Sequence, residues 1–171
     1  KNIDRGFYDA EIMNKYTKAE FGALDGVIDH SRDNDLTYAA MEQFRGKYLV
    51  QNRATGEVFE TPQVAYILIA ATLFGDYPSE TRLQYVKDYY DAISKFDLSL
   101  PTPVMAGVRT PQRQFSSCVL IETDDSLDSI NATSSSIVKY VSQKAGIGIG
   151  AGSIRAIGSA IRSGDATHTG V

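Results

Sequence analysis

The chain has 171 residues, of which 43% are hydrophobic and 22% charged, as in a soluble globular domain long enough to bury a core. Its net charge of −4 argues against a nucleic-acid polymer as a partner. A single cysteine excludes an internal disulfide and fits a reducing compartment, so we expect a cytoplasmic protein. The most apolar run, Val64 to Phe74, is shorter than the roughly 20 residues of a membrane helix, so no membrane partner is expected.

The sequence before residue 100 predicts a mainly helical region. Thr17 and Glu20 fit a capping box, in which the threonine hydroxyl accepts the third helical N–H and the glutamate reaches back to the threonine N–H. A helix should therefore begin here and end near Val27. A second helix is expected near residues 36–44, where apolar and aromatic side chains recur at helical spacing.

The next segments predict a hairpin and then two further helices. Short β-like runs at residues 48–50 and 57–59 flank a glycine-containing turn. Thr61 followed by a proline is typical of a helix start, and residues 64–74 are apolar on every side, which predicts a helix buried in the core. Ser79 is the expected cap of the following helix, which should end near residue 96.

The composition changes at Leu100, where three prolines and a glycine within fifteen residues exclude a long helix. We therefore distinguish residues 1–99 from residues 100–171, within one structural unit because nothing resembles a linker. The run from Phe115 to Ile121 should form a strand, and the lack of alternation in its second half indicates cover on both faces.

The last expected elements are a helix and a glycine-rich tail. Asp125 and Ser126 should cap a helix over residues 127–144, whose small residues would let another helix approach closely, as at a dimer face. Residues 146–170 carry seven glycines, at 146, 148, 150, 152, 158, 164 and 170, which favours an ordered loop with unusual backbone angles over a helix.

Cys118 and Thr102 are the first candidate functional residues. A cysteine in an apolar strand is either an inert small hydrophobe or a thiol that delivers electrons, with Ser116 or Ser117 binding an oxyanion beside it. Thr102 lies between two prolines that fix the backbone on either side. It is either part of a rigid turn or a contact to a ligand phosphate.

The glycine-rich tail offers a second candidate site. Arg155 and Arg162 lie among exposed backbone amides, which is either a solvated loop or a cradle for phosphate. Asp124, Asp125 and Asp128 stand at a helix start, either as capping residues or with one carboxylate holding a sugar hydroxyl. The glycine pattern fits neither the dinucleotide fingerprint nor a P-loop.

The two histidines predict no metal site. His30 and His168 have no metal-ligand spacing with each other or with Cys118. A pairing of Cys118 with His168 stays open, and with it the possibility of a cysteine hydrolase.

Longer stretches of this sequence resemble a known family. The run LPTPVMAGVRTPQRQFSSCVLIETDDSLDSINATSSSIVKYVSQKAGIGIG, with IRAIGSAIRSGDATHTG after it, is similar to the large, catalytic subunit of class I ribonucleotide reductase. GKYLVQN and YPSETRLQYVKDYYDAIS share this likeness, so it covers nearly the whole chain. The resemblance implies an α/β fold in which a mainly helical N-terminal region precedes a ten-stranded α/β barrel, with FSSCVLI as the first barrel strand.

The resemblance also implies roles for individual residues. Cys118 would be one of two cysteines that reduce a ribonucleoside diphosphate to its deoxy form by radical chemistry and become a disulfide. Thr102 and Ser117 would bind the substrate diphosphate. The specificity effector, a deoxynucleoside triphosphate or ATP, would be bound by Asp125, Ser126, Leu127, Arg155 and Arg162.

Partners follow from the same resemblance. The chain would act with the remainder of a large subunit, as a homodimer whose effector site forms across the dimer, with a metal-containing small subunit that supplies the radical and with thioredoxin or glutaredoxin as reductant. Gly150 and Ser153 stand where close relatives have asparagine and arginine. Because the second redox cysteine and the radical-bearing cysteine are absent, we expect a fragment of a longer or split protein that is inactive alone. The alternative is a non-catalytic nucleotide-binding or interaction module.

Overall fold

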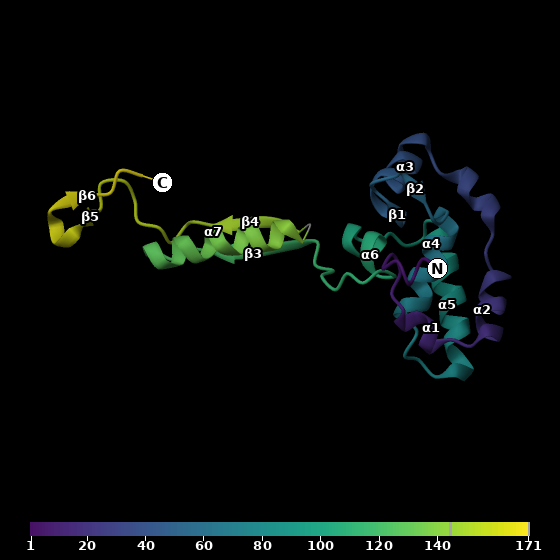
Figure 1. Cartoon of the computed structure of the whole chain (residues 1–171). Helices are drawn as coiled ribbons and strands as arrows, with labels where there is room; N and C mark the ends of the chain where they lie inside the picture. Colours follow the sequence, from purple (N-terminus) through teal and green to yellow (C-terminus); the bar gives the residue numbers. More distant parts are fainter. Residues whose placement is uncertain (144, 171) are drawn as a thin grey trace. The chain divides into compact units, whose positions relative to one another are not determined.

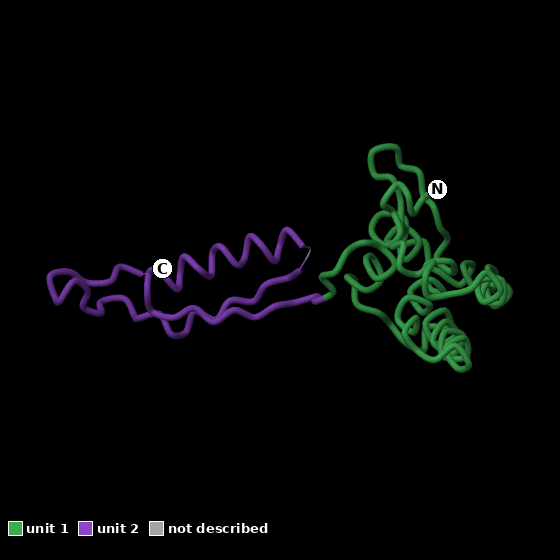
Figure 2. Tube along the Cα trace, turned by 60° about the horizontal axis from the view of Figure 1, so that its bottom comes forward, with its two compact units in different colours: residues 1–115 green, residues 116–171 purple. Residues whose placement is uncertain are grey.

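The computed structural model describes residues 1–143 and 145–170, and it divides into two compact units (Figure 2). Unit 1 comprises residues 1–115 and unit 2 begins at Ser116. The compact units thus separate later in the chain than the change of composition at Leu100. Residues 100–115 belong to unit 1 because they bring a buried arginine, Arg109, into its interior.

Unit 1 is mainly helical, as the sequence predicts (Figure 1). Its α-helices are α1 (Glu11–Lys15), α2 (Lys18–Asp25), α3 (Tyr38–Gln43), α4 (Pro62–Leu73), α5 (Ser79–Ser94) and α6 (Thr102–Gly107). A 3₁₀ helix (His30–Asp35), a π-helical segment (Phe44–Tyr48) and the antiparallel pair β1 (Gln51–Asn52) and β2 (Glu57–Val58) complete its elements.

Local capping explains where two of these helices begin. The capping box of α2 is confirmed, since the Thr17 side chain accepts from the Glu20 N–H and the Glu20 carboxylate accepts from the Thr17 N–H at 2.7 Å. The start of α4 is confirmed as well, because the Thr61 hydroxyl accepts from the Val64 N–H. Most of α4 is buried, and it packs against α5 in the core.

Three expectations for unit 1 need correction. Ser79 does not cap α5: it is the first helical residue, and Pro78 precedes it without a side-chain cap. The helix expected over residues 36–44 begins at Tyr38, because Thr37 supplies the cap through its bond from the Ala40 N–H. The first hairpin strand lies at residues 51–52 rather than 48–50, where Tyr48 ends a π-helical segment.

A fully buried ion pair between Arg109 and Glu60 joins distant segments of unit 1. Arg109 Nε donates to both Glu60 carboxylate oxygens, at 3.0 and 2.9 Å, and its Nη2 contacts the same carboxylate. Further bonds run from Arg109 to the carbonyl oxygens of Met105 (2.7 Å) and Tyr48 (3.0 Å). Tyr8 donates to Glu60 at 3.0 Å, and burial together with this carboxylate raises the pKa of Tyr8. Because every member has a partner, the two charges are tolerated in the interior.

Unit 2 begins with a parallel strand pair whose connection is a long helix. Strand β3 (Cys118–Glu122) pairs with β4 (Gly146–Gly150) over five registered positions, from Cys118 opposite Gly146 to Glu122 opposite Gly150. Helix α7 (Leu127–Ser142) links them and runs alongside both strands (Figure 1). Its N-cap is Ser126, as predicted, while Lys144, the expected helix end, lies outside the described residues. The short pair β5 (Ala160–Ile161) and β6 (Ala166–Thr167) follows.

Two expectations for unit 2 were wrong. The first strand begins at Cys118 rather than Phe115, and its residues alternate between exposed and half-buried instead of being covered on both faces. The alternation arises because α7 packs along the β3–β4 pair while side chains such as Leu120, 85% exposed, face away. The first part of the glycine-rich tail is strand β4 and not a loop, since GIGIG alternates with period two.

The glycines of β4 allow side chains of β3 to lie across it. A Cβ placed on Gly148 would lie 2.6 Å from the Leu120 Cδ2, and one on Gly150 would lie within 2.5 Å of the Glu122 carboxylate. Within the described residues the pair does not close into a barrel, so the fold matches the expected helical region and the beginning of an α/β barrel domain, without its closure.

Replacing Arg109 by alanine should destabilise unit 1 by about 3–5 kcal/mol, because it leaves the Glu60 carboxylate buried without a cationic partner. The matched control is Arg113→Ala, which breaks an ion pair to Asp9 whose arginine is 60% exposed, and which should cost about 0–1 kcal/mol. Urea unfolding followed by circular dichroism measures the free energy of unfolding of both variants. Equal losses for the two variants would contradict the role assigned to the buried pair.

Candidate functional site

A cavity of about 320 Å³ lies in unit 2, beyond the carboxyl ends of β3 and β4. The carboxyl ends of parallel strands meet at one edge, so the segment after β3 and the segment after β4 both reach this place. The cavity is lined by Asp125, Ser126, Leu127, Ile130, Ile154, Arg155, Ile161, Arg162 and His168. The structure therefore brings together all five residues that the sequence assigned to an effector site.

The turn between β3 and α7 fixes one wall of this cavity. The Ser126 hydroxyl accepts from the Ser129 N–H at 3.1 Å, and the Ser129 hydroxyl accepts from the Asp124 N–H at 2.9 Å. Below the turn, the buried hydroxyls of Thr123 and Thr133 bond to each other at 2.9 Å and tie β3 to α7. Ser126 thus acts as the helix cap, and Leu127 beside it leaves its side chain 85% exposed.

Asp125 and Arg155 form an ion pair across the cavity wall. Arg155 Nε donates to the two Asp125 oxygens at 2.9 and 2.7 Å, and the Arg155 backbone N–H donates to the same carboxylate at 3.2 Å. These bonds hold the pKa of Asp125 below its ordinary value, so the carboxylate is ionised at neutral pH. Arg155 is consequently oriented, and Asp125 offsets one of the two guanidinium charges at the cavity.

Arg162 is presented by a strained turn. Arg162 and Ser163 have φ angles of 52° and 57°, and Gly164 has 99°, so the chain reverses sharply between β5 and β6. Gly158 and Gly170 also have positive φ, which confirms the unusual backbone angles expected for this part of the tail. Within the part of the chain that the structure describes, the Arg162 guanidinium has no hydrogen-bond or ion-pair partner. It is available to an anionic ligand.

Cys118 lies at the start of β3 and is exposed. The cover on both faces that the sequence predicts for this strand is not found at Cys118 among the described residues, because one packed helix and one paired strand leave this end of β3 open. Gly146 lies opposite, and a Cβ there would stand 3.6 Å from the Cys118 sulfur. Ser117 is exposed too, and its carbonyl oxygen accepts from the Gly146 N–H at 2.9 Å.

Thr102, the third residue of the expected substrate site, belongs to unit 1, whereas Ser117 and Cys118 belong to unit 2. Thr102 is the first residue of α6 after Pro101, is half-buried, and has its hydroxyl 3.4 Å from the Tyr48 hydroxyl. The two prolines do place Thr102 at a fixed turn into a helix. Its neighbour Tyr48 could not be inferred from sequence, because 54 residues separate the two.

Sequence reasoning missed the apolar wall and the histidine of the unit 2 cavity. Ile130, Ile154 and Ile161 supply apolar surface, and His168 lines the same space. A signal for His168 was present, since Gly158 precedes the β5–β6 hairpin and Gly164 lies in its turn, and this hairpin returns residue 168 beside residue 159. From the sequence, His168 is a candidate only for a metal site or for a pairing with Cys118.

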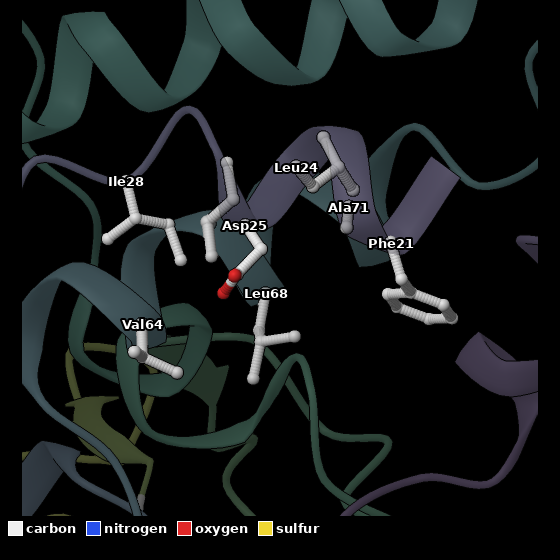
Figure 3. A pocket seen from close by; sticks show the side chains of 8 residues that line it. Phe21, Leu24, Asp25, Ile28, Val64, Leu68 and Ala71 are labelled. Atoms are coloured by element: carbon white, nitrogen blue, oxygen red, sulfur yellow. The ribbon is translucent and has the colours of Figure 1, made fainter. Parts of the chain in front are cut away.

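Unit 1 contains a smaller cavity of about 160 Å³ between α2 and α4 (Figure 3). It is apolar except for Asp25, whose carboxylate lies among Ile28, Val64 and Leu68 in the view. None of the functional residues predicted from the sequence lines this cavity. Among the described residues, no cluster of three histidine, cysteine, aspartate or glutamate side chains could hold a metal ion. None of the described helices is both long and apolar enough to cross a membrane.

Comparisons with known proteins agree with this division of the chain. Residues 34–113 match the family described as "Ribonucleotide reductase, all-alpha domain", and residues 116–171 match "Ribonucleotide reductase, barrel domain". The chain is 65% identical over 170 residues to ribonucleoside-diphosphate reductase 1 subunit alpha of Escherichia coli (strain K12), covering 99% of this chain and 22% of that protein.

Other relatives give the same result. Ribonucleoside-diphosphate reductase subunit alpha of Haemophilus influenzae is 66% identical over 163 residues, covering 95% of this chain and 22% of that protein. The subunit alpha of Enterobacteria phage T4 is 50% identical over 169 residues, covering 99% of this chain and 22% of that protein. The chain belongs to the family of ribonucleotide reductase large subunits, and it spans about a fifth of the length of these relatives.

Replacing Arg155 by alanine should raise the pKa of Asp125 toward its ordinary value, because the hydrogen bonds from Arg155 are the main cause of the lowered pKa. The Asp125 carboxylate would then protonate at a higher pH than in the unaltered chain. Carbon-13 NMR titration of the aspartate carboxyls measures the shift. Arg162→Ala is the matched control and should leave the Asp125 pKa unchanged. A pKa that stays low in Arg155→Ala would contradict the ion pair.

Proposed function

We propose that this chain forms part of a ribonucleoside-diphosphate reductase large subunit, which reduces ribonucleoside diphosphates to 2′-deoxyribonucleoside diphosphates. Membership of the family supports the reaction, and the single observation that supports a regulatory nucleotide site is the gathering of five sequence-predicted residues around one cavity. We further propose that unit 1 corresponds to the helical region and unit 2 to the start of the reductase barrel, so that the boundary lies near Ser116 rather than at Leu100.

Cys118 is proposed as one of the two thiols consumed in each turnover. Reduction at C2′ replaces the hydroxyl by hydrogen and releases water, while two thiols lose two electrons and two protons and become a disulfide. Because Cys118 is the only cysteine in the sequence, the second thiol must come from outside it.

Thr102 and Ser117 are proposed to bind the substrate diphosphate and so hold the ribose near the thiol. Thr102 presents a hydroxyl from a proline-fixed helix start, and Ser117 directly precedes Cys118. Binding through these groups positions the substrate, whereas the radical that starts the reaction would come from a metal-containing small subunit. Thioredoxin or glutaredoxin would then reduce the disulfide.

The unit 2 cavity is proposed as the site of the specificity effector, a deoxynucleoside triphosphate or ATP. Arg162 and Arg155 would contact the phosphates, Asp125 a sugar hydroxyl, and the isoleucine wall the base. Its volume of about 320 Å³ lies within the ordinary range for small-molecule sites, about 300–1,000 Å³. Effector binding here would bias substrate choice through a coupling free energy between two sites.

Homodimerisation is proposed through α7. Leu127, Ser134, Val138 and Val141 recur at spacings of seven, four and three and so share one face of the helix. Three of these are apolar and exposed, Leu127 at 85%, Val138 at 69% and Val141 at 54%. An apolar stripe interleaved with a small serine suits close packing against the same helix of a second copy. Leu127 also lines the cavity, which links dimerisation to the effector site.

Cys118→Ser in the full protein should abolish formation of deoxyribonucleotides, because serine cannot contribute to a disulfide. Binding of dTTP should be unchanged, since Cys118 does not line the effector cavity. Steady-state turnover with the small subunit and reductant measures deoxyribonucleotide formation, and calorimetry measures dTTP binding. Retained reduction would refute the role of Cys118. Triphosphate binding without any reduction in the unaltered protein would favour a non-catalytic nucleotide-binding module.

Val138→Glu should dissociate the proposed dimer, because it places a charge in the exposed apolar stripe of α7. Lys139→Glu is the control, since residue 139 is exposed on a different face of the same helix. Analytical ultracentrifugation gives the dimer dissociation constant, which should rise at least about tenfold for Val138→Glu and far less for the control. Similar constants for both variants would exclude this face as the interface.

A further inference from the structure

We propose that His168 is a third protein donor to the effector's phosphates, through the N–H of its Nε2 nitrogen. This proposal rests on the proposed effector site in unit 2 and adds a residue that neither the sequence nor the family resemblance assigned to it. It is based on three observations: where the backbone places His168, which of its ring nitrogens is open, and which charges surround it.

The backbone of His168 is fixed by the β5–β6 hairpin. Its N–H donates to the Ser159 carbonyl oxygen at 2.9 Å, and its carbonyl oxygen accepts from the Gly158 N–H at 2.9 Å. The hairpin that holds His168 at its base also carries Arg162 at its turn, and both side chains line the cavity. His168 is thus positioned by regular pairing, next to the segment that supplies the unpartnered guanidinium.

The two ring nitrogens of His168 differ in their surroundings. Nδ1 is buried without a hydrogen-bond partner in the described part of the chain. Nε2 has no partner among those residues either and is not among the buried atoms, so it is the ring nitrogen of this cavity-lining residue that a ligand can reach. Nδ1 lacks a partner among the described residues in either neutral tautomer. The tautomer with its proton on Nε2 presents an N–H donor at the open ring nitrogen, and an anionic ligand there would select it.

The charges around His168 select the kind of ligand. Asp125 lines the same cavity as His168, and the Asp125 carboxylate holds the Arg155 guanidinium. Among the described residues, the Arg162 guanidinium and the Nε2–H of His168 remain as donors without acceptors at the cavity. A polyphosphate supplies several anionic oxygens and can accept from both donors. The isoleucine wall has no hydrogen-bonding side chain, so it suits the base rather than the phosphates.

Two substitutions at His168 distinguish the loss of its N–H donor from the loss of its ring shape. In His168→Gln the side-chain amide can reach the position of Nε2–H, whereas in His168→Asn it ends near the position of Nδ1. Affinity of the full protein for dTTP should fall about tenfold or more in His168→Asn and stay within about threefold in His168→Gln. Affinity for thymidine, which lacks phosphates, should be the same in all three proteins.

His30→Asn serves as a matched control, because His30 is exposed in unit 1 and lines no part of the cavity. Isothermal calorimetry gives the affinities, and thermal unfolding verifies that each variant is folded. Equal affinity for dTTP in all variants would overturn the proposal. Equal losses in folded His168→Gln and His168→Asn would overturn it as well, since they would indicate packing of the ring. An unaltered protein that fails to bind dTTP would instead refute the effector site itself.

Discussion

Parallel pairing of β3 with β4 is the constraint on which the candidate site of unit 2 depends. It requires a crossover connection, which α7 provides, and it sends the segments after both strands to the same edge. Asp125 follows β3 and Arg155 follows β4, so the two meet in an ion pair although 30 residues separate them. The β5–β6 hairpin then closes the remaining wall with Arg162 and His168. Asp125 and Arg155 thus derive their places from the β3–β4 pairing, whereas Arg162 and His168 derive theirs from the hairpin.

Unit 1 depends in a similar way on the buried pair of Arg109 and Glu60. One guanidinium bonds the Glu60 carboxylate, the Met105 carbonyl in α6 and the Tyr48 carbonyl at the end of the π-helical segment. The pair therefore fixes α6, whose first residue is Thr102, against the segment that carries the Tyr48 side chain. The ion pair stabilises unit 1 only while both charges are fully hydrogen-bonded, because a buried charge without its partner is strongly unfavourable.

Exposed functional surface distinguishes unit 2. The thiol of Cys118, the apolar stripe of α7 and the unpartnered guanidinium of Arg162 are all accessible. We propose that these three surfaces meet, in turn, a second thiol, a second copy of the chain and a nucleotide. The chain spans about a fifth of its relatives, so these surfaces are the places where we propose that the remaining protein and its ligands act.

The sequence by itself determined the local features and the family. The capping box of Thr17, the proline start of α4, the cap at Ser126 and the positive φ of Gly164 all depend on neighbours within a few residues. Tertiary structure decided the rest. Nothing local shows that GIGIG pairs with the strand of Cys118, because a parallel partner lies across a helix. Exposure of Cys118 likewise depends on which faces the neighbouring elements cover, and the roles of Arg109 and His168 depend on contacts between residues far apart in sequence or on either side of a turn.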